Sequence, residues 1–79
     1  MKAVIGFHGT VYGMVSVEEG KLVYEGRDPF ALQTVVERYL QLWERGVGVE
    51  EGQGVPEEFI RALPTMIGAG YLWCNLQEA

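Results

Sequence analysis

The sequence has one cysteine, one histidine and no long apolar run among its 79 residues. A single cysteine cannot form a disulfide within the chain, and a structural zinc site commonly needs four Cys or His ligands. No segment approaches the roughly 18 apolar residues that a membrane-spanning helix requires, and no signal-peptide pattern opens the chain. We therefore expect a cytoplasmic protein with no metal and no other cofactor.

Positive charge is also scarce, because six Lys and Arg residues face eleven Asp and Glu residues and leave a formal net charge of -5. Nucleic-acid binding depends on concentrated positive charge that releases counterions from the phosphate backbone. The cations here are scattered along the chain. DNA and RNA are therefore not expected as partners.

Two strands are predicted near the start, over residues 2–7 and 10–17, where β-branched and aromatic side chains suit a pleated surface. His8 and Gly9 lie between them, and we expect a two-residue turn with positive φ at both positions. Gly6 and Gly13 would then lie inside strands. Glycine in a strand often marks a bulge or the close approach of another backbone.

A second two-residue turn is predicted at Glu19 and Gly20, followed by a third strand over residues 22–25. This turn places Val17 opposite Leu22, so that apolar side chains pair across the strands. The first 25 residues therefore predict a three-stranded antiparallel meander.

An amphipathic helix is predicted next, with Asp28 as its N-cap, Pro29 at its first position and Gly46 at its end. Its apolar side chains follow the i, i+3, i+4 spacing that places them on one face. These residues are Leu32, Val35, Val36, Tyr39, Leu40 and Trp43.

The last third of the chain predicts a flexible Gly/Glu-rich loop over residues 46–54, a short helix over 55–64 that Pro64 ends, and a final strand over 71–77. Alternation places Leu72, Cys74 and Leu76 on one face of that strand. The whole chain is predicted to be a single α+β domain of order βββααβ, with the last strand completing one sheet.

This order is similar to that of the HicB-like antitoxin domain, a partial RNase H-type unit in which three strands precede a helix and a fourth strand. The resemblance covers the order of the elements over most of the chain. A shared fold does not carry function, so it implies an architecture only.

Both faces of the predicted sheet are expected to be apolar. One is predicted to carry Ala3, Ile5, Phe7, Tyr12, Met14 and Val23, and the other to carry Val4, Val11, Val15, Val17, Leu22 and Tyr24. One layer of helices covers one face, and a large exposed apolar face lowers solubility. We therefore expect the other face to be covered by the second helix folding round, by a second copy of the chain or by a different protein.

Few residues of the sequence indicate catalysis. The glycines of residues 5–13 lead into a strand, whereas a phosphate-binding loop leads into a helix whose amides hold the anion. His8 and Cys74 could form a nucleophile pair only if the fold brought them together, and Cys74 shares its face with leucines, where a free cysteine is usually buried. No paired carboxylates are placed by their spacing for acid and base roles.

The sequence therefore favours a small regulatory or protein-interaction module over an enzyme. The predicted contact residues are Phe7, Tyr12, Tyr71 and Trp73, because aromatic side chains contribute strongly to interfaces. The alternative is a ligand-binding or catalytic domain with a pocket near His8 and Gly9.

Overall fold

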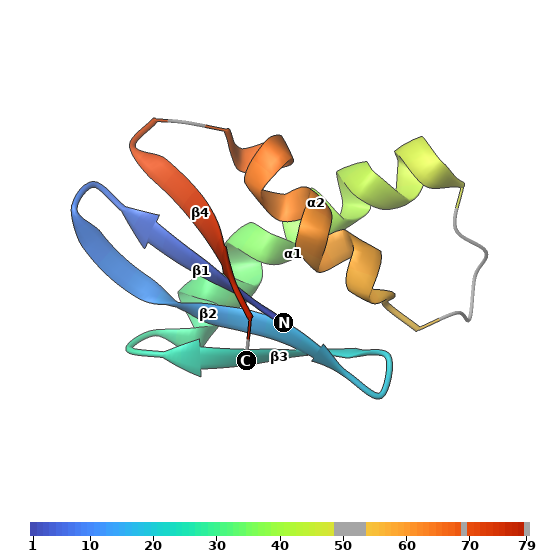
Figure 1. Ribbon diagram of the computed structural model, residues 1–79, viewed down its shortest axis with the longest axis horizontal. Helices are drawn as coiled ribbons and strands as arrows, with labels where there is room; N and C mark the ends of the chain where they lie inside the picture. Colours follow the sequence, from blue (N-terminus) through green and yellow to red (C-terminus); the bar gives the residue numbers. More distant parts are fainter. Residues whose placement is uncertain (49–53, 69, 79) are drawn as a thin grey trace.

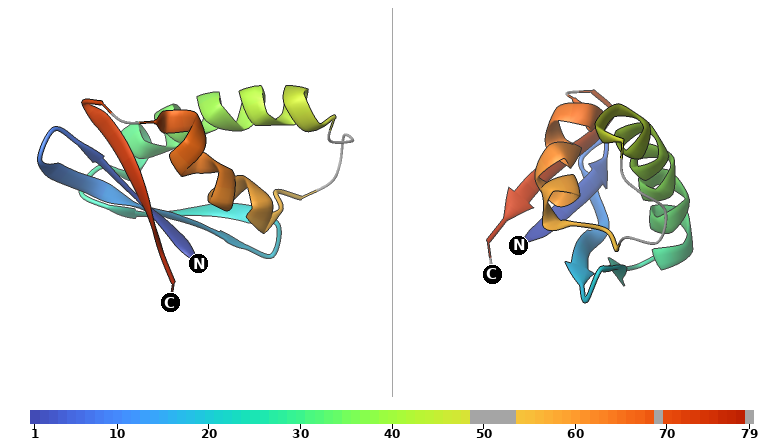
Figure 2. Two further views of the ribbon diagram at one scale, coloured as in Figure 1. Left: turned by 45° about the horizontal axis from the view of Figure 1, so that its top comes forward. Right: turned by 90° about the vertical axis from the view of Figure 1, so that its right-hand side faces the viewer.

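A computed structural model describes residues 1–48, 54–68 and 70–78 and shows one antiparallel sheet with two helices (Figure 1). The strands are β1 (Lys2–Phe7), β2 (Thr10–Glu18), β3 (Lys21–Gly26) and β4 (Leu72–Gln77), and they lie side by side in the order β3-β2-β1-β4. The helices are α1 (Pro29–Val47) and α2 (Glu57–Ile67). Both helices cover the same face of the sheet (Figure 2). This is the predicted α+β order βββααβ.

A β-bulge at Tyr12 sets the register between β1 and β2. Gly6 lies opposite Val11, but Ile5 lies opposite Gly13, so Tyr12 has no partner across the ladder. A turn at residues 8–9 without a bulge would have placed Ile5 opposite Tyr12. Because side chains alternate along a strand, the extra residue moves the rest of β2 to the opposite face.

The predicted division of the sheet into two faces is therefore wrong beyond the bulge. Ala3 lies opposite Val15, and both are fully buried beneath the helices, whereas Val4 lies opposite Met14 on the helix-free face. The predicted pairing of Val17 with Leu22 is confirmed. Through this pairing, the change of face at the bulge extends from β2 to β3. The helix-covered face thus unites apolar residues from both predicted sets, which are Ala3, Ile5, Val15, Val17, Leu22 and Tyr24.

The helix-free face is consequently less apolar than predicted. Val4 and Met14 lie there beside Glu25, which pairs with Met14 across the ladder. Lys2 forms an ion pair with Glu25, with 3.2 Å between its Nζ and Oε2 atoms, so a polar bridge reaches from β1 to β3. This mixture of apolar and charged groups is compatible with contact with water on this face.

The two hairpin turns differ in their backbone angles. Glu19 and Gly20 have φ angles of 52° and 77°, as predicted for the second turn. In the first turn His8 has a φ of 56°, but Gly9 is not among the residues with positive φ, so the prediction is wrong at Gly9. A turn with positive φ only at its first central residue also closes a two-residue hairpin.

Replacement of His8 by asparagine is expected to change the free energy of unfolding by less than about 0.5 kcal/mol, because asparagine tolerates positive φ and the imidazole is exposed. Replacement by valine is expected to cost about 1–2 kcal/mol, because a β-branched residue is strained there. Urea denaturation of both variants measures the difference. Equal stability of the two would contradict a requirement for positive φ.

Helix α1 begins as predicted and ends two residues later than predicted. The Asp28 Oδ1 atom accepts a hydrogen bond of 3.0 Å from the backbone N–H of Ala31. Gly46 lies inside the helix, and Gly48, with a φ of 69°, caps it by donating its N–H to the carbonyl of Glu44. Gly48 takes this role because the left-handed C-cap conformation suits glycine. Of the predicted loop over residues 46–54, residues 49–53 lie outside the described residues.

Helix α2 continues one turn past Pro64, so the prediction that Pro64 ends it is wrong. Phe59, Ile60 and Leu63 are fully buried, and Met66 and Ile67, beyond the proline, pack against the same core. Partial burial of these two side chains offsets part of the roughly 3 kcal/mol that an interior proline costs. The helix ends at Gly68, whose N–H donates to the carbonyl of Pro64.

Candidate functional site

Four ring-bearing side chains meet at the β1–β2 turn, and we name them the aromatic cluster: Phe7, His8, Tyr12 and Tyr71. Ring centroids lie 4.3 Å apart for Phe7 and His8, and 4.7 Å apart for His8 and Tyr71. The rings of Phe7 and Tyr12 are stacked with their centroids 6.3 Å apart. All four residues are exposed, with Tyr71 at 72%. The fold therefore gathers aromatic surface at one end of the molecule.

The cluster is held together by hydrogen bonds between the turn and the start of β4. The backbone N–H of His8 donates to the carbonyl of Tyr71 over 2.6 Å. The indole Nε1–H of Trp73 donates to the carbonyl of His8 over 2.5 Å. The backbone N–H and the carbonyl of His8 are both bonded to residues 71–73. The turn and this segment therefore form one fixed unit.

The Trp73 side chain has a structural role, because its ring packs on β1 and supports the turn. It lies opposite Gly6 across the β1–β4 ladder, and a Cβ at Gly6 would overlap the indole ring. The missing side chain of Gly6 thus provides the space that the ring occupies. Three of the predicted contact residues, Phe7, Tyr12 and Tyr71, belong to the exposed cluster. The fourth, Trp73, packs on Gly6 and is bonded to the turn.

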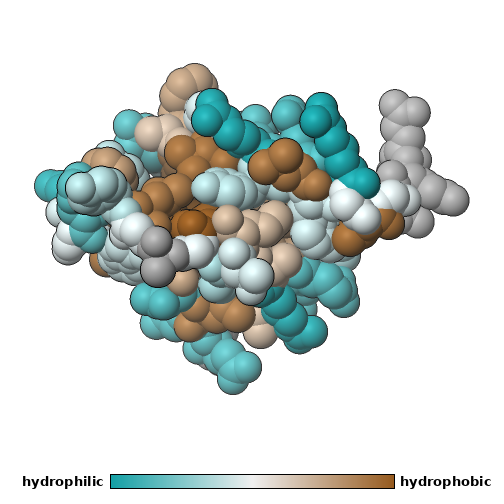
Figure 3. Space-filling model, turned by 90° about the horizontal axis from the view of Figure 1, so that it is seen from above, coloured by the Kyte–Doolittle hydropathy of each residue, from teal (hydrophilic) through white to brown (hydrophobic). Residues whose placement is uncertain are grey.

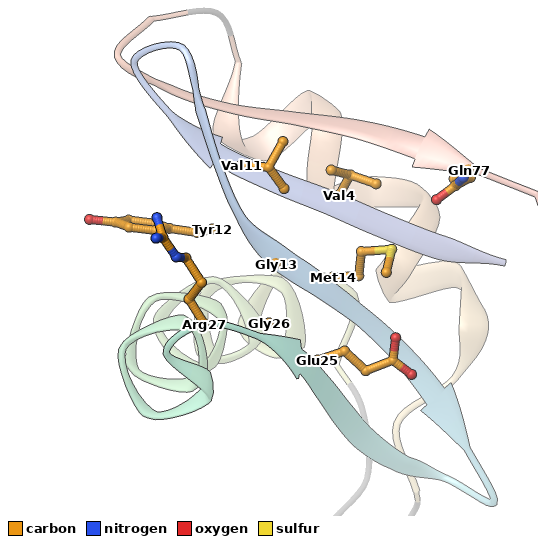
Figure 4. A pocket seen from close by; sticks show the side chains of 9 residues that line it. All are labelled: Val4, Val11, Tyr12, Gly13, Met14, Glu25, Gly26, Arg27 and Gln77. Carbon is orange, nitrogen blue, oxygen red and sulfur yellow. The ribbon is translucent and has the colours of Figure 1, made fainter.

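An open hollow of about 490 Å³ lies on the helix-free face of the sheet (Figure 4). Val4, Val11 and Met14 form its apolar floor, and Glu25, Arg27 and Gln77 stand at its margins. Tyr12 belongs both to this hollow and to the aromatic cluster. The hollow was not predicted from the sequence, because its shape depends on the bulge.

A smaller hollow of about 170 Å³ lies between α1 and the start of β4 and includes Val35, Tyr39 and Leu72. Leu72 pairs with Phe7 of the cluster across the β1–β4 ladder. Viewed from above, the molecule shows apolar residues gathered around a depression near its middle (Figure 3). Neither hollow is lined by His8 or Gly9, the residues around which the alternative prediction placed a pocket.

The possible nucleophile pair of His8 and Cys74 has no support in the geometry. Cys74 lies opposite Ile5 on the helix-covered face and is buried, whereas His8 is exposed in the turn. Burial raises the pKa of the Cys74 thiol to about 11. The thiol is therefore neutral near pH 7, and a neutral thiol is a weak nucleophile.

The raised pKa of Cys74 predicts a loss of stability at alkaline pH. The thiol of an unfolded chain titrates near about pH 8.5, and the folded thiol near pH 11, so the unfolded state loses its proton first. The contribution of the neutral thiol to the free energy of unfolding is complete below about pH 8.5 and is lost as the pH rises toward 11. Urea denaturation across this range should show a steeper decline for the wild type than for Cys74→Ala. Parallel declines would contradict the assignment.

Other chemistry is sparse among the described residues. In residues 1–48, 54–68 and 70–78, no group of three or more His, Cys, Asp or Glu side chains is placed to hold a metal ion. No described helix is long and apolar enough to cross a membrane. No protein-family model matches the chain, and neither the curated proteins nor the solved structures include a significant match.

Proposed function

We propose that this protein is a small cytoplasmic regulatory module that acts by binding another protein through the aromatic cluster, rather than by catalysis. The observation that supports the proposal is the exposure of the Phe7, Tyr12 and Tyr71 rings on a unit held by hydrogen bonds from the His8 backbone N–H and the Trp73 indole. Tyrosine is enriched among the residues that dominate interface energies, because its ring buries a large area and its hydroxyl remains able to bond.

Rigidity adds to the case for this surface. A flexible aromatic loop would lose conformational entropy on binding, at a cost of about 0.5–1.5 kcal/mol for each immobilised side chain. The rings of the cluster already contact one another, and the turn that carries His8 is bonded to Tyr71 and Trp73. A partner would therefore meet a surface that is largely formed before binding.

Affinity capture from the native host, read by mass spectrometry, tests the proposal. The wild type is compared with the double variant Tyr12→Ala/Tyr71→Ala, which removes two exposed rings and leaves the backbone groups at residue 71 in place. We expect a protein that the wild type captures and the double variant does not. Phe30→Ala is the control, because Phe30 is an aromatic residue in the first turn of α1 and is 78% exposed.

The proposal requires that the control variant capture the same protein as the wild type. Identical capture by all three proteins, or an equal loss in the control and the double variant, would contradict it. Circular dichroism of each variant confirms that the fold is retained before capture is compared.

A further inference from the structure

Strand β4 forms one edge of the sheet, and its sequence does not protect that edge. Its six residues, LWCNLQ, contain no charged residue and no proline, and its register with β1 is regular from Lys2 to Phe7. The opposite edge, β3, carries Lys21, Glu25 and a terminal glycine. Natural proteins protect exposed edges with charges, prolines or bulges, because unpaired backbone groups accept further strands.

Leu76 belongs to this edge strand and lies on the helix-covered face of the sheet. It lies opposite Ala3 in the β1–β4 ladder, and Ala3 is fully buried, yet Leu76 is 41% exposed. Helix α2 lies above β4 along the same margin of the molecule (Figure 2). The cover that α2 provides thus stops short of the end of β4, and an apolar side chain on the core face of the sheet remains in contact with water.

We propose that β4 pairs with β4 of a second copy of this chain, antiparallel and about a two-fold axis at Cys74, to form one continuous sheet. An axis perpendicular to the sheet keeps the helices of both copies on the same side. Leu72 of each copy then lies opposite Leu76 of the other, and Trp73 lies opposite Asn75. Apolar groups therefore meet on the helix-covered face, and an aromatic ring meets an amide on the other.

A second copy can pair with this edge without placing like charges opposite each other. Each copy carries a formal net charge of -5, and like charges placed directly opposite each other in a ladder are destabilising. The ladder centred on Cys74 pairs residues 72–76 of the two copies and contains no charge. An axis one residue later, at Asn75, would place Glu78 opposite Leu72, so the register at Cys74 is favoured.

This dimer does not rest on the proposed function of the aromatic cluster. Leu76 lies near the far end of β4 from Tyr71, and the cluster is built from contacts within one copy. If both hold, the dimer carries two clusters, and a partner with two matching sites would bind more tightly than a single cluster allows.

Sedimentation equilibrium of the full chain over a wide concentration range tests the dimer. We expect the wild type to have the mass of two chains and Leu76→Lys to have the mass of one, because the lysines would enter the core face of the joined sheet. Val11→Lys is the matched control, since Val11 is 51% exposed on the helix-free face and outside β4. It should remain a dimer. A monomeric wild type, or dissociation by Val11→Lys alone, would overturn the proposal.

Hydrogen exchange of the wild type keeps the proposal testable if Leu76→Lys does not fold. The β4 amides that point away from β1 are expected to exchange more slowly as the protein concentration rises, while those of the β3 edge do not change. Exchange at β4 that is independent of concentration would overturn the pairing. Loss of cluster-dependent capture with the dimer intact would count against the proposed function alone.

Discussion

Replacement of Phe59 by alanine is expected to lower the free energy of unfolding by about 3–5 kcal/mol, the range for removal of a fully buried aromatic ring. Phe59 has no exposed surface and packs against Trp43 of α1, with the ring centroids 5.7 Å apart. It also belongs to the same buried core as Ala3 and Ile5 of β1, so it joins both helices to the sheet. A domain of 79 residues typically has a total stability of about 4–12 kcal/mol, so this loss would remove a large part of it.

Chemical denaturation followed by circular dichroism measures the effect, and Phe30→Ala is the control. Phe30 is also a helical phenylalanine, but it is largely exposed, so its removal should change stability by less than about 0.5 kcal/mol. A loss at Phe59 below about 1 kcal/mol would show that α2 is not anchored in the core as the structure has it.

Replacement of Gly6 by alanine is expected to cost about 2–3 kcal/mol, because the added methyl group would overlap the Trp73 ring and overpacking is destabilising. Displacement of the ring would also break its hydrogen bond to the carbonyl of His8. The change should therefore loosen the turn that carries the aromatic cluster. Urea denaturation measures the cost, and tryptophan fluorescence reports the environment of the displaced ring.

Gly9→Ala is the matched control for this experiment. Gly9 lies three residues away in the same hairpin, has no atom within 4 Å of a Cβ built on it, and does not have the positive φ that would strain an alanine. Its replacement should leave both stability and fluorescence close to those of the wild type. Equal effects at Gly6 and Gly9 would contradict the specific packing of Trp73 on Gly6.

The prediction that Pro64 ends α2 failed because tertiary packing outweighs a local preference. Pro64 normally ends a helix, but apolar side chains before it are buried, and the partly buried Met66 and Ile67 after it pack against the same core. The end of α1 is decided locally between two glycines, because Gly46 stays helical and Gly48, two residues later, adopts the left-handed cap. The competition at Pro64 cannot be decided from the residues next to the proline alone.

The candidate site shows the same division. The aromatic residues were identified from their side-chain types, because exposed rings favour binding wherever they lie. Their meeting at one turn could not be predicted, since Tyr71 is more than sixty residues from Phe7 in sequence. The contact depends on the pairing of β4 with β1 rather than with β3.

The sequence by itself determined the elements and the second hairpin, because capping residues, turn residues and side-chain periodicity act over a few positions, as at Asp28 and Gly20. The tertiary structure decided which side chains share a face. One extra residue at Tyr12 moves Val15 into the core, and the burial of Val15 beneath the helices rewards that register over the unbulged one. Burial against α1 and α2 is a long-range interaction, so it appears only once the whole chain has folded.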